Sequence, residues 1–190
     1  MVERQKNTAL IEIESNFLRL IPLDNRLLTI WNTEGRHQME IILGLNPSDW
    51  EVDFLHETET KNALQNFWIP QTHLNPDNFY WYSNWEIVLI ETNSSIGGIG
   101  FAGFPEKGST VIGYTIDKKF HNRGFATEAL NCLLDWAFMD PTLKIVLADT
   151  PIDNYPSQKV LIKNGFKRIG EGVDEDTQTI QVYHWAKNRP

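Results

Sequence analysis

A loop between a predicted strand and a predicted helix carries the residues best suited to hold an anion. The strand covers Thr110 to Ile116, and the loop and first helical turn read His121-Asn-Arg-Gly-Phe-Ala-Thr127. The first turn of a helix has unpaired N–H groups and the positive end of the helix dipole, which together favour a phosphate. Gly124 lacks a Cβ, so a ligand can approach the backbone closely, and two lysines and an arginine add positive charge. The pattern predicts a phosphate-bearing ligand.

The residues after this loop form an amphipathic helix. Its apolar positions recur at helical spacing and are Ala126, Ala129, Leu130, Leu133, Leu134 and Ala137. Polar residues, including Glu128, take the other side, where Glu128 is expected to be structural rather than catalytic. Cys132 is the chain's single cysteine. It rules out an internal disulfide or a cysteine metal site and favours a reducing compartment.

The other elements follow from periodicity and turn signals. Strands are predicted at 9–13, 17–21, 85–91, 96–104, 110–116, 144–149, 166–171 and 179–185. Helices are predicted at 24–45 with a break near Gly35, from a Ser48/Glu51 capping box to Ile69-Pro70, from Ala126, and at 156–164. The order of helices, antiparallel meander and strand–helix–strand crossover indicates a mixed α/β fold with a mostly antiparallel sheet.

Composition limits the classes of function. The 190 residues are expected to form a single domain, 1–190, and the formal charge of −8 argues against a broad nucleic-acid surface. An acidic chain weakly favours a cationic acceptor. The N-terminus has no apolar signal region and no apolar run approaches transmembrane length, so a cytoplasmic protein without a membrane partner is expected.

Two motifs in order resemble the GNAT superfamily of N-acetyltransferases, in particular the branch that acetylates the N-termini of ribosomal proteins. The family's acetyl-CoA loop, Gln/Arg-x-x-Gly-x-Gly/Ala, is similar to His121-x-x-Gly124-x-Ala126. The branch's Asn-x-x-Ser…Gly-Phe pattern is similar to Asn154-x-x-Ser157 followed by Gly165-Phe166. The opening 17–23 also resembles the family's first strand. The loop departs from the family at His121 and at Asn122, where glycine is frequent, but neither change removes a backbone donor.

The resemblance implies a fold, a co-substrate and a reaction. The fold is a twisted, mostly antiparallel sheet with a central splay and flanking helices, and pantetheine lies in the splay like an added strand. The reaction is direct attack of a primary amine on the thioester of acetyl-CoA. The acceptor is either a protein N-terminus or a small-molecule amine, and the oligomeric state is open, a dimer being one option. The implied cofactor-binding residues are Tyr114, Thr115, Ile116, His121, Asn122, Arg123, Gly124, Phe125, Ala126, Thr127, Asn154 and Ser157.

The implied catalytic residues are Ser157 and Tyr114. Many family members carry a tyrosine as general acid four residues before the Gly-Phe glycine, where this chain has Leu161. Ser157, near the sulfur, is therefore the candidate acid. Tyr114 acting through water, Glu86 and Glu91 are candidate bases, the two glutamates being expected on one strand.

Other interpretations are weaker. Gly98-Ile-Gly-Phe-Ala-Gly103 matches a dinucleotide fingerprint but precedes a turn rather than a helix, so a closely packed glycine-rich strand is expected. The five histidines lack ligand spacing, so no metal is expected. The aromatic run 79–82 with Trp85 either packs in the core, which is favoured, or lines an acceptor pocket or partner surface. Because Leu161 replaces the tyrosine that many family members use as general acid, a second interpretation remains. In it, the chain is a module of the same fold that binds acyl-CoA or an effector without turnover.

Overall fold

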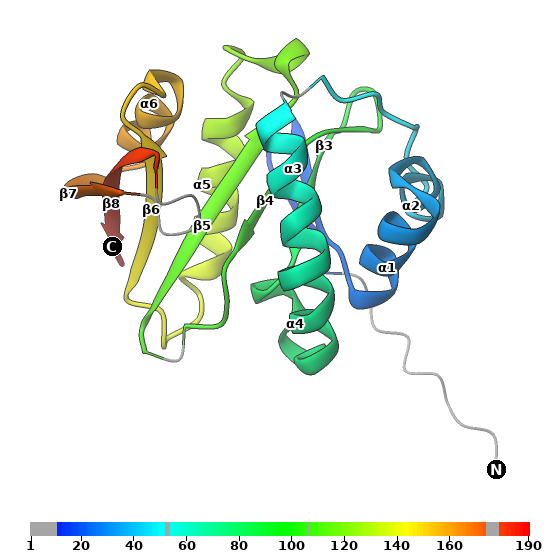
Figure 1. The fold of residues 1–190 in the computed structure, drawn as a ribbon, viewed down its shortest axis with the longest axis horizontal. Helices are drawn as coiled ribbons and strands as arrows, with labels where there is room; N and C mark the ends of the chain where they lie inside the picture. Colours follow the sequence, from blue (N-terminus) through cyan, green and yellow to red (C-terminus); the bar gives the residue numbers. More distant parts are fainter. Residues whose placement is uncertain (1–10, 52–53, 106, 174–178) are drawn as a thin grey trace.

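The sheet runs through the whole molecule and is mostly antiparallel. A computed structural model describes residues 11–51, 54–105, 107–173 and 179–190 (Figure 1). Its strands form one eight-stranded sheet of order β1-β2-β3-β4-β5-β6-β8-β7. They are β1 (Ile13–Glu14), β2 (Leu18–Pro22), β3 (Asn84–Leu89), β4 (Ser94–Phe101), β5 (Ser109–Ile116), β6 (Ile145–Pro151), β7 (Lys167–Val173) and β8 (Gln181–Asn188). Among the described strands, β5 and β6 form the single parallel pair. The predicted fold class is confirmed.

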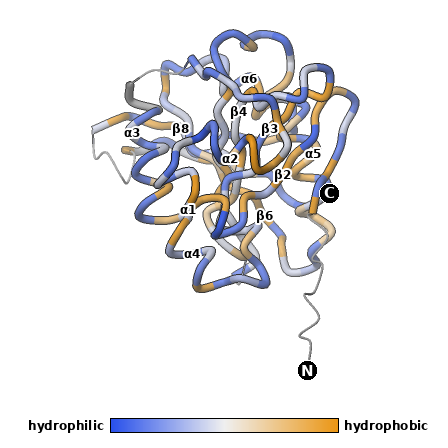
Figure 2. The backbone as a smooth tube through the Cα atoms, turned by 90° about the vertical axis from the view of Figure 1, so that its right-hand side faces the viewer, coloured by the Kyte–Doolittle hydropathy of each residue, from blue (hydrophilic) through white to orange (hydrophobic). Residues whose placement is uncertain are grey.

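Helices pack on the sheet and on one another through a main core and a smaller one, and a third cluster joins Ile21, Leu45 and Val88. They are α1 (Asn25–Glu34), α2 (Arg36–Ile42), α3 (Phe54–Ala63), α4 (Ile69–Leu74), α5 (Phe125–Ala137) and α6 (Tyr155–Lys163), with short turns η1 (Leu64–Trp68), η2 (Pro76–Trp81) and η3 (Lys118–Phe120). The apolar face of α5 packs on the sheet in the main core, while α1, α2 and η1 share a smaller one. Figure 2, viewed from the side of α1 and α2, shows hydrophobic and hydrophilic stretches alternating along these elements.

The sheet opens between β5 and β6. These strands pair only from Ser109↔Ile145 to Val111↔Leu147. Beyond that point β5 stays paired with β4 up to Ile116, and β6 stays paired with β8 up to Pro151. The two strands therefore separate at their carboxyl ends, which is the predicted central splay.

The helical region departs from prediction at two places. The helix does not stop at Ile69-Pro70, because a π turn, in which Ile69 N–H bonds to Leu64 C=O, leads into α4. Proline has no N–H to donate to the helical hydrogen-bond pattern. The π turn changes that pattern just before Pro70, so Pro70 is accommodated in the first turn of α4. The Ser48/Glu51 capping box is also wrong. The Ser48 hydroxyl donates to Glu40, and the Glu51 N–H donates to Asp117.

Strand predictions differ from the structure mainly at the chain's ends. Residues 9 and 10 lie outside the described residues, and β1 covers only Ile13–Glu14. The hairpin of β7 and β8 is confirmed, whereas its acidic turn at 174–176 is not among the described residues. β3 ends at Leu89, so Glu91 lies in the following turn and does not share a strand with Glu86.

The glycines of β4 serve close packing, as expected for the alternative to a dinucleotide fingerprint. A Cβ on Gly97 would lie 2.3 Å from the Thr115 carbonyl oxygen, and one on Gly100 would lie 2.3 Å from the Ser83 carbonyl oxygen. β3 and β5 thus approach β4 more closely than side chains would permit.

Candidate active site

The start of α5 presents backbone N–H groups that no side chain caps. Its N-cap residue, Gly124, has φ of 90° and supplies no side-chain hydrogen bond to the first turn. The first intrahelical bond runs from Glu128 N–H to Gly124 C=O at 3.0 Å, so the N–H groups of residues 125–127 precede the ladder. Asn122 has φ of 60°, a conformation that asparagine tolerates better than most side chains and that explains why glycine also suits this position.

A cleft of about 390 Å³ lies between the carboxyl end of β5, the loop and first turn of α5, and α6. All the predicted cofactor-binding residues line it except Arg123. The Arg123 guanidinium instead lies over Phe125, 4.9 Å from the ring centroid, and Arg123 borders a neighbouring depression with Phe17 and Ile90. The cleft also receives residues that the sequence analysis did not single out as ligands: Lys118, Phe120, Pro156, Lys159, Val160 and Lys163.

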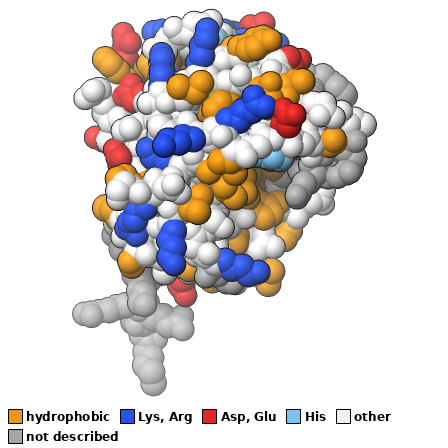
Figure 3. All heavy atoms as spheres, turned by 90° about the vertical axis from the view of Figure 1, so that its left-hand side faces the viewer, with side chains coloured by type: hydrophobic (Ala, Val, Ile, Leu, Met, Phe, Trp, Pro, Cys, Tyr) orange, Lys and Arg blue, Asp and Glu red, His pale blue; other side chains and the backbone are white. Residues whose placement is uncertain are grey.

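Two lysines of α6 line the cleft and were not predicted from the sequence as part of the site, although their spacing indicates a shared helix face. Lys159 and Lys163 are four residues apart on a helix that starts at Tyr155, so they share one face. Both line the cleft opposite the α5 N-terminus, together with Lys118. Figure 3 shows Lys and Arg side chains gathered on the side of the molecule that carries α6, β7 and β8.

His121 acts on the backbone of β5. Its Nε2 lies 2.8 Å from the Ile116 carbonyl oxygen. The contact connects the loop to the end of the strand. His121 therefore shapes the loop as well as lining the cleft.

Two hydroxyl groups meet in the cleft. The Tyr114 hydroxyl lies 2.8 Å from Ser157 Oγ and 3.2 Å from the Ser157 carbonyl oxygen, to which it donates. Burial raises the pKa of Tyr114 to about 12, and the hydrogen bond to Ser157 only partly offsets this effect. A phenol with that pKa keeps its proton at neutral pH, so Tyr114 is suited to donate a hydrogen bond and not to act as a base.

Asn154 and Leu161 fix the position of Ser157 on α6. Asn154 Oδ1 accepts the Ser157 N–H at 3.1 Å and caps the helix. At the other end, Gly165 has φ of 80°, and Phe166 N–H bonds to the Leu161 carbonyl at 3.1 Å, as in a Schellman motif. Leu161 is fully buried in the main core and offers the cleft no polar group.

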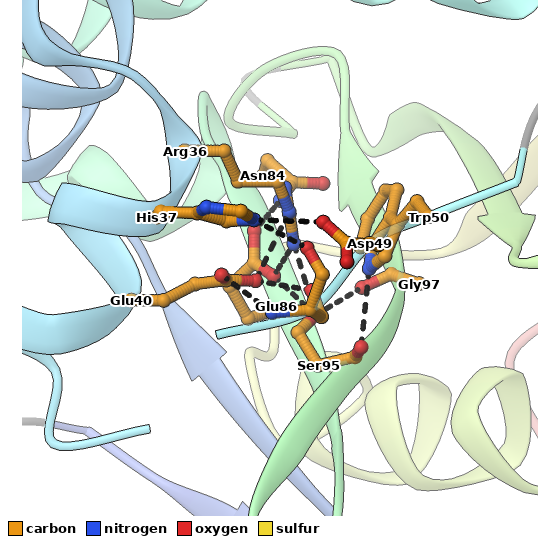
Figure 4. A network of polar contacts seen from close by, with 10 residues as sticks. Arg36, His37, Glu40, Asp49, Trp50, Asn84, Glu86, Ser95 and Gly97 are labelled. Carbon is orange, nitrogen blue, oxygen red and sulfur yellow. Dashed lines mark hydrogen bonds and ion pairs between the residues drawn. The ribbon is translucent and has the colours of Figure 1, made fainter. Parts of the chain in front are cut away.

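Neither candidate glutamate is placed to act as a base. Glu86 is fully buried and ion-pairs with Arg36, while Ser95 Oγ and Asn84 Nδ2 donate to it (Figure 4). Burial is the main cause that raises the pKa of Glu86, against the lowering effect of Arg36. Glu91 is exposed and borders the depression near Arg123. Both expectations are corrected, because neither carboxylate lines the cleft.

The buried charges around Glu86 connect α2 to the cofactor loop. The Arg36 guanidinium stacks 3.5 Å from the Trp50 ring centroid and also pairs with Glu40 (Figure 4). Trp50 Nε1 donates to the Ser95 carbonyl at 3.1 Å. We refer to residues 46–51 as the strap. It continues to the loop, where Lys118 N–H donates to the Glu51 carbonyl at 3.1 Å.

The structure also bears on the aromatic run, on a metal site and on a membrane-spanning helix. Trp81 and Trp85 are 2% and 0% exposed and stack with Trp136, so the favoured interpretation of core packing is confirmed for them. Within the described ranges, His, Cys, Asp and Glu form no group of three that could hold a metal ion. No helix in the part of the chain that the structure describes is long and apolar enough to cross a bilayer.

Comparisons with known proteins agree with this geometry. The acetyltransferase (GNAT) domain family model matches residues 22–167. Two uncharacterized N-acetyltransferases are similar in sequence: YjdG of Bacillus subtilis, 36% identical over 45% of this chain and 51% of its own length, and p20 of Bacillus licheniformis, 33% identical over 46% and 50%. The chain thus matches about half the length of these curated relatives.

Solved structures share the fold. A ribosomal L7/L12 α-N-protein acetyltransferase, RimL, in complex with coenzyme A superposes with a TM-score of 0.65 at 18% identity, covering 94% of this chain and 98% of that one. A ribosomal-protein-S5-alanine acetyltransferase from Vibrio fischeri gives a TM-score of 0.64 at 19% identity, covering 94% and 97%. The sheet with its splay and the helix-start loop define a GNAT acetyltransferase domain. This chain belongs to the GNAT acetyltransferase family.

Proposed function

We propose that this chain, acting as one domain, transfers an acetyl group from acetyl-CoA to a primary amine. One observation carries the proposal: the uncapped N-terminus of α5 opens into the cleft that the carboxyl end of β5 and helix α6 also line. The cleft fits CoA chemically, because backbone N–H groups and Lys118, Lys159 and Lys163 can neutralise its phosphates. A Cβ on Gly124 would meet nothing within 4 Å, so ligand atoms have room beside the backbone.

The hydroxyl pair supports direct transfer to the amine. The neutral amine nitrogen forms a bond to the thioester carbonyl carbon, the carbon–sulfur bond breaks, and the nitrogen releases a proton to water. Ser157 donates a hydrogen bond or a proton to the departing sulfur, and the Tyr114 phenol, 2.8 Å away, supports that hydroxyl. Little acid assistance is needed, because a thiol pKa of about 8.5 makes thiolate a tolerable leaving group near neutral pH.

The lack of a placed base favours an α-amino acceptor. In the described part of the cleft, no carboxylate is present to take the amine proton. A lysine-like amine with a pKa of about 10.4 is neutral about once in 2,500 at pH 7, a penalty of roughly 4.6 kcal/mol. An α-amino group with a pKa near 8 costs only about 1.4 kcal/mol. Protein N-termini, the substrates named for RimL, are thus the acceptor class we favour over small-molecule amines.

The proposal is tested by release of free CoA thiol from acetyl-CoA with an amine panel. The panel contains peptides that begin with serine, alanine or methionine, their N-acetylated forms as controls, spermidine and an aminoglycoside. We expect release with free N-terminal peptides and none with the N-acetylated forms. Tight CoA binding without amine-dependent release would instead identify a non-catalytic binding module, the alternative that Leu161 keeps open.

A further inference from the structure

The two faces of the sheet differ at the splay. On the face covered by α5 and α6, Ile112 and Ile116 of β5 and Val146 and Ala148 of β6 are buried. Alternate residues point to the opposite face, where Val111 is 43% exposed. Figure 1 shows α3 and α4 in front of β4 and β5, whereas no described helix lies in front of β6 and β8. Since helices close the cleft from one side, an acceptor has access from this open face.

An acidic side chain stands on the open face at the splay. Asp149 is two residues beyond Leu147, the last residue of β6 that pairs with β5. Its neighbours in β6, Ala148 and Thr150, are buried, so the Asp149 side chain projects from the other face, where it is 43% exposed. Within the described residues, the ion pair that Asp149 makes is with His184.

The surroundings hold this carboxylate in a defined orientation. Asp149 and His184 are directly opposed across β6 and β8, and His184 Nδ1 lies 2.8 Å from Asp149 Oδ1. The imidazole lies over β7, where a Cβ on Gly172 would come within 2.7 Å of His184 Nε2. Gly172 thus makes room for the ring. The contact of His184 is with Oδ1, so Oδ2 of Asp149 receives no hydrogen bond from His184.

The strand opposite Asp149 leaves space for a ligand. Continuing the parallel register past Val111↔Leu147 brings Gly113 opposite Asp149, on the same face of the sheet. A Cβ on Gly113 would meet nothing within 4 Å. The carboxylate of Asp149, held in place by His184, therefore lies beside unoccupied space over Gly113, where β5 and β6 begin to separate. This space is on the face of the sheet that α5 and α6 do not cover.

We propose that Asp149, oriented by His184, binds the ammonium form of the acceptor on the open face before transfer. This inference rests on the proposed function and adds an acceptor subsite to it. A carboxylate that is already hydrogen-bonded and fixed attracts a primary ammonium by charge and accepts its N–H donors. Asp149 is thus an acceptor-binding residue, and His184 is a positioning residue.

The test measures ammonium binding without turnover. Protein carrying 15N-labelled histidine and saturated with CoA is titrated with alaninamide, and the His184 ring signals are followed by NMR. Propanamide, which lacks only the amino group, is the matched ligand control. We expect a saturable shift with alaninamide, none with propanamide, and loss of the response in Asp149→Asn. An equal response to both ligands, or an unchanged response in Asp149→Asn, would overturn the proposal.

Kinetics with the serine-initiated peptide then separate binding from chemistry. We expect Asp149→Asn to raise KM for the peptide at least tenfold, while kcat changes less than threefold and the Kd for CoA is unchanged. His184→Ala should raise KM partway, and His184→Asn, which keeps a donor near the Nδ1 position, should restore it. Asp135→Asn on the outer face of α5 removes the same charge as a control and should leave KM unchanged. An unchanged KM in Asp149→Asn would refute the subsite.

The two proposals fail in different ways. If no amine releases CoA from acetyl-CoA in the wild-type protein, the transfer function is refuted, while the NMR titration still decides whether Asp149 binds an ammonium group. If amines are acetylated but His184 does not respond to alaninamide, the transfer function stands and the subsite is refuted.

Discussion

At the scale of single residues, we propose that the Tyr114–Ser157 hydroxyl pair, 2.8 Å apart, does the work of the tyrosine that many family members carry where this chain has Leu161. Leu161 is committed to the core, so the polar groups come from β5 and from the first turn of α6. We expect Ser157→Ala to lower kcat about tenfold, less than the roughly 10²–10⁴-fold typical of general acid–base catalysis, because thiolate leaves readily. Tyr114→Phe should have a smaller effect, since it acts through Ser157.

The controls for the hydroxyl pair are the Kd for CoA and a second phenol. Titration calorimetry should give a Kd for CoA within about twofold of wild type for both variants, because neither removes a phosphate contact. Tyr80→Phe removes a hydroxyl that bonds Asn78 away from the cleft and should not change kcat. Full activity of Ser157→Ala would remove its proposed role.

The raised pKa of Tyr114 bears on how kcat/KM should depend on pH. Burial raises it to about 12, so the phenol stays protonated throughout the working range. With no carboxylate base placed in the cleft, kcat/KM for a peptide should rise with pH as its α-amino group deprotonates, with a midpoint near pH 8. Up to about pH 10, kcat/KM should not decrease again, because Tyr114 keeps its proton over this range. A midpoint that stays fixed when the acceptor amine's pKa is changed would indicate an enzyme base instead.

At the scale of elements, the start of α5 should be the main phosphate-binding feature. Gly124→Trp places a large side chain into open space at the helix N-cap, and we expect the Kd for CoA to rise at least tenfold. Gly44→Trp is the matched control, because Gly44 also has positive φ (72°) and open space, but lies after α2 and away from the cleft. Calorimetry that shows equal losses for both variants would assign the effect to backbone strain and not to the cleft.

Sequence patterns predicted elements well where local chemistry determines them. The helix predicted from Ala126 begins at Phe125, and the predicted break near Gly35 separates α1 from α2; these follow from periodicity and from a single glycine. Two other predictions failed because the side chains concerned bind partners on other elements. Ser48 bonds to Glu40 instead of capping a helix, and Glu86 is held by Arg36 across the fold. Glu86 and Arg36 are 50 residues apart, and Ser48 contacts a helix eight residues before it, so the local spacing of either pattern could not predict these contacts.

At the scale of the whole molecule, charge is segregated along the chain. Residues 1–110 contain 7 Lys and Arg against 15 Asp and Glu, whereas residues 111–190 contain ten of each. The excess acidity therefore belongs to the part that includes α1 to α4, and the half that forms the cofactor cleft is neutral with lysines at the cleft. This distribution would draw a cationic acceptor toward the protein without repelling the CoA phosphates as strongly as the net charge suggests.

Lysines of the cleft should dominate the salt dependence of CoA binding. We expect the double variant Lys159→Gln, Lys163→Gln to raise the Kd for CoA about tenfold at low salt and to flatten its dependence on ionic strength, because screened charge pairs are lost. Lys167→Gln is the control, since Lys167 is exposed on β7 and does not line the cleft. The measurement is calorimetry between low and high sodium chloride. An unchanged salt dependence would place the phosphates elsewhere.

The buried charges around Arg36 hold the N-terminal helices to the sheet. Arg36 on α2 contacts Glu86 on β3 and Trp50 of the strap, so its loss removes the contacts that join these three segments. We expect Arg36→Met to destabilise the protein by about 3–5 kcal/mol in urea unfolding, because it leaves buried carboxylates unpaired. Arg26→Met, exposed on α1, should stay within about 0.5 kcal/mol of wild type.

The same network should make stability depend on pH in a defined direction. Because the folded pKa of Glu86 is raised, its contribution to stability is present below its unfolded pKa of about 4.5 and is lost as pH rises through the folded value. The free energy of unfolding of the wild type, relative to Glu86→Gln, should therefore fall as pH rises above about 4.5. In Arg36→Met this fall should be larger and continue to higher pH, since the lowering effect of the guanidinium on the pKa of Glu86 is gone. Parallel pH curves for wild type and Glu86→Gln would show that the carboxylate does not titrate with folding, and the buried pair would then stabilise the fold in a fixed ionised state.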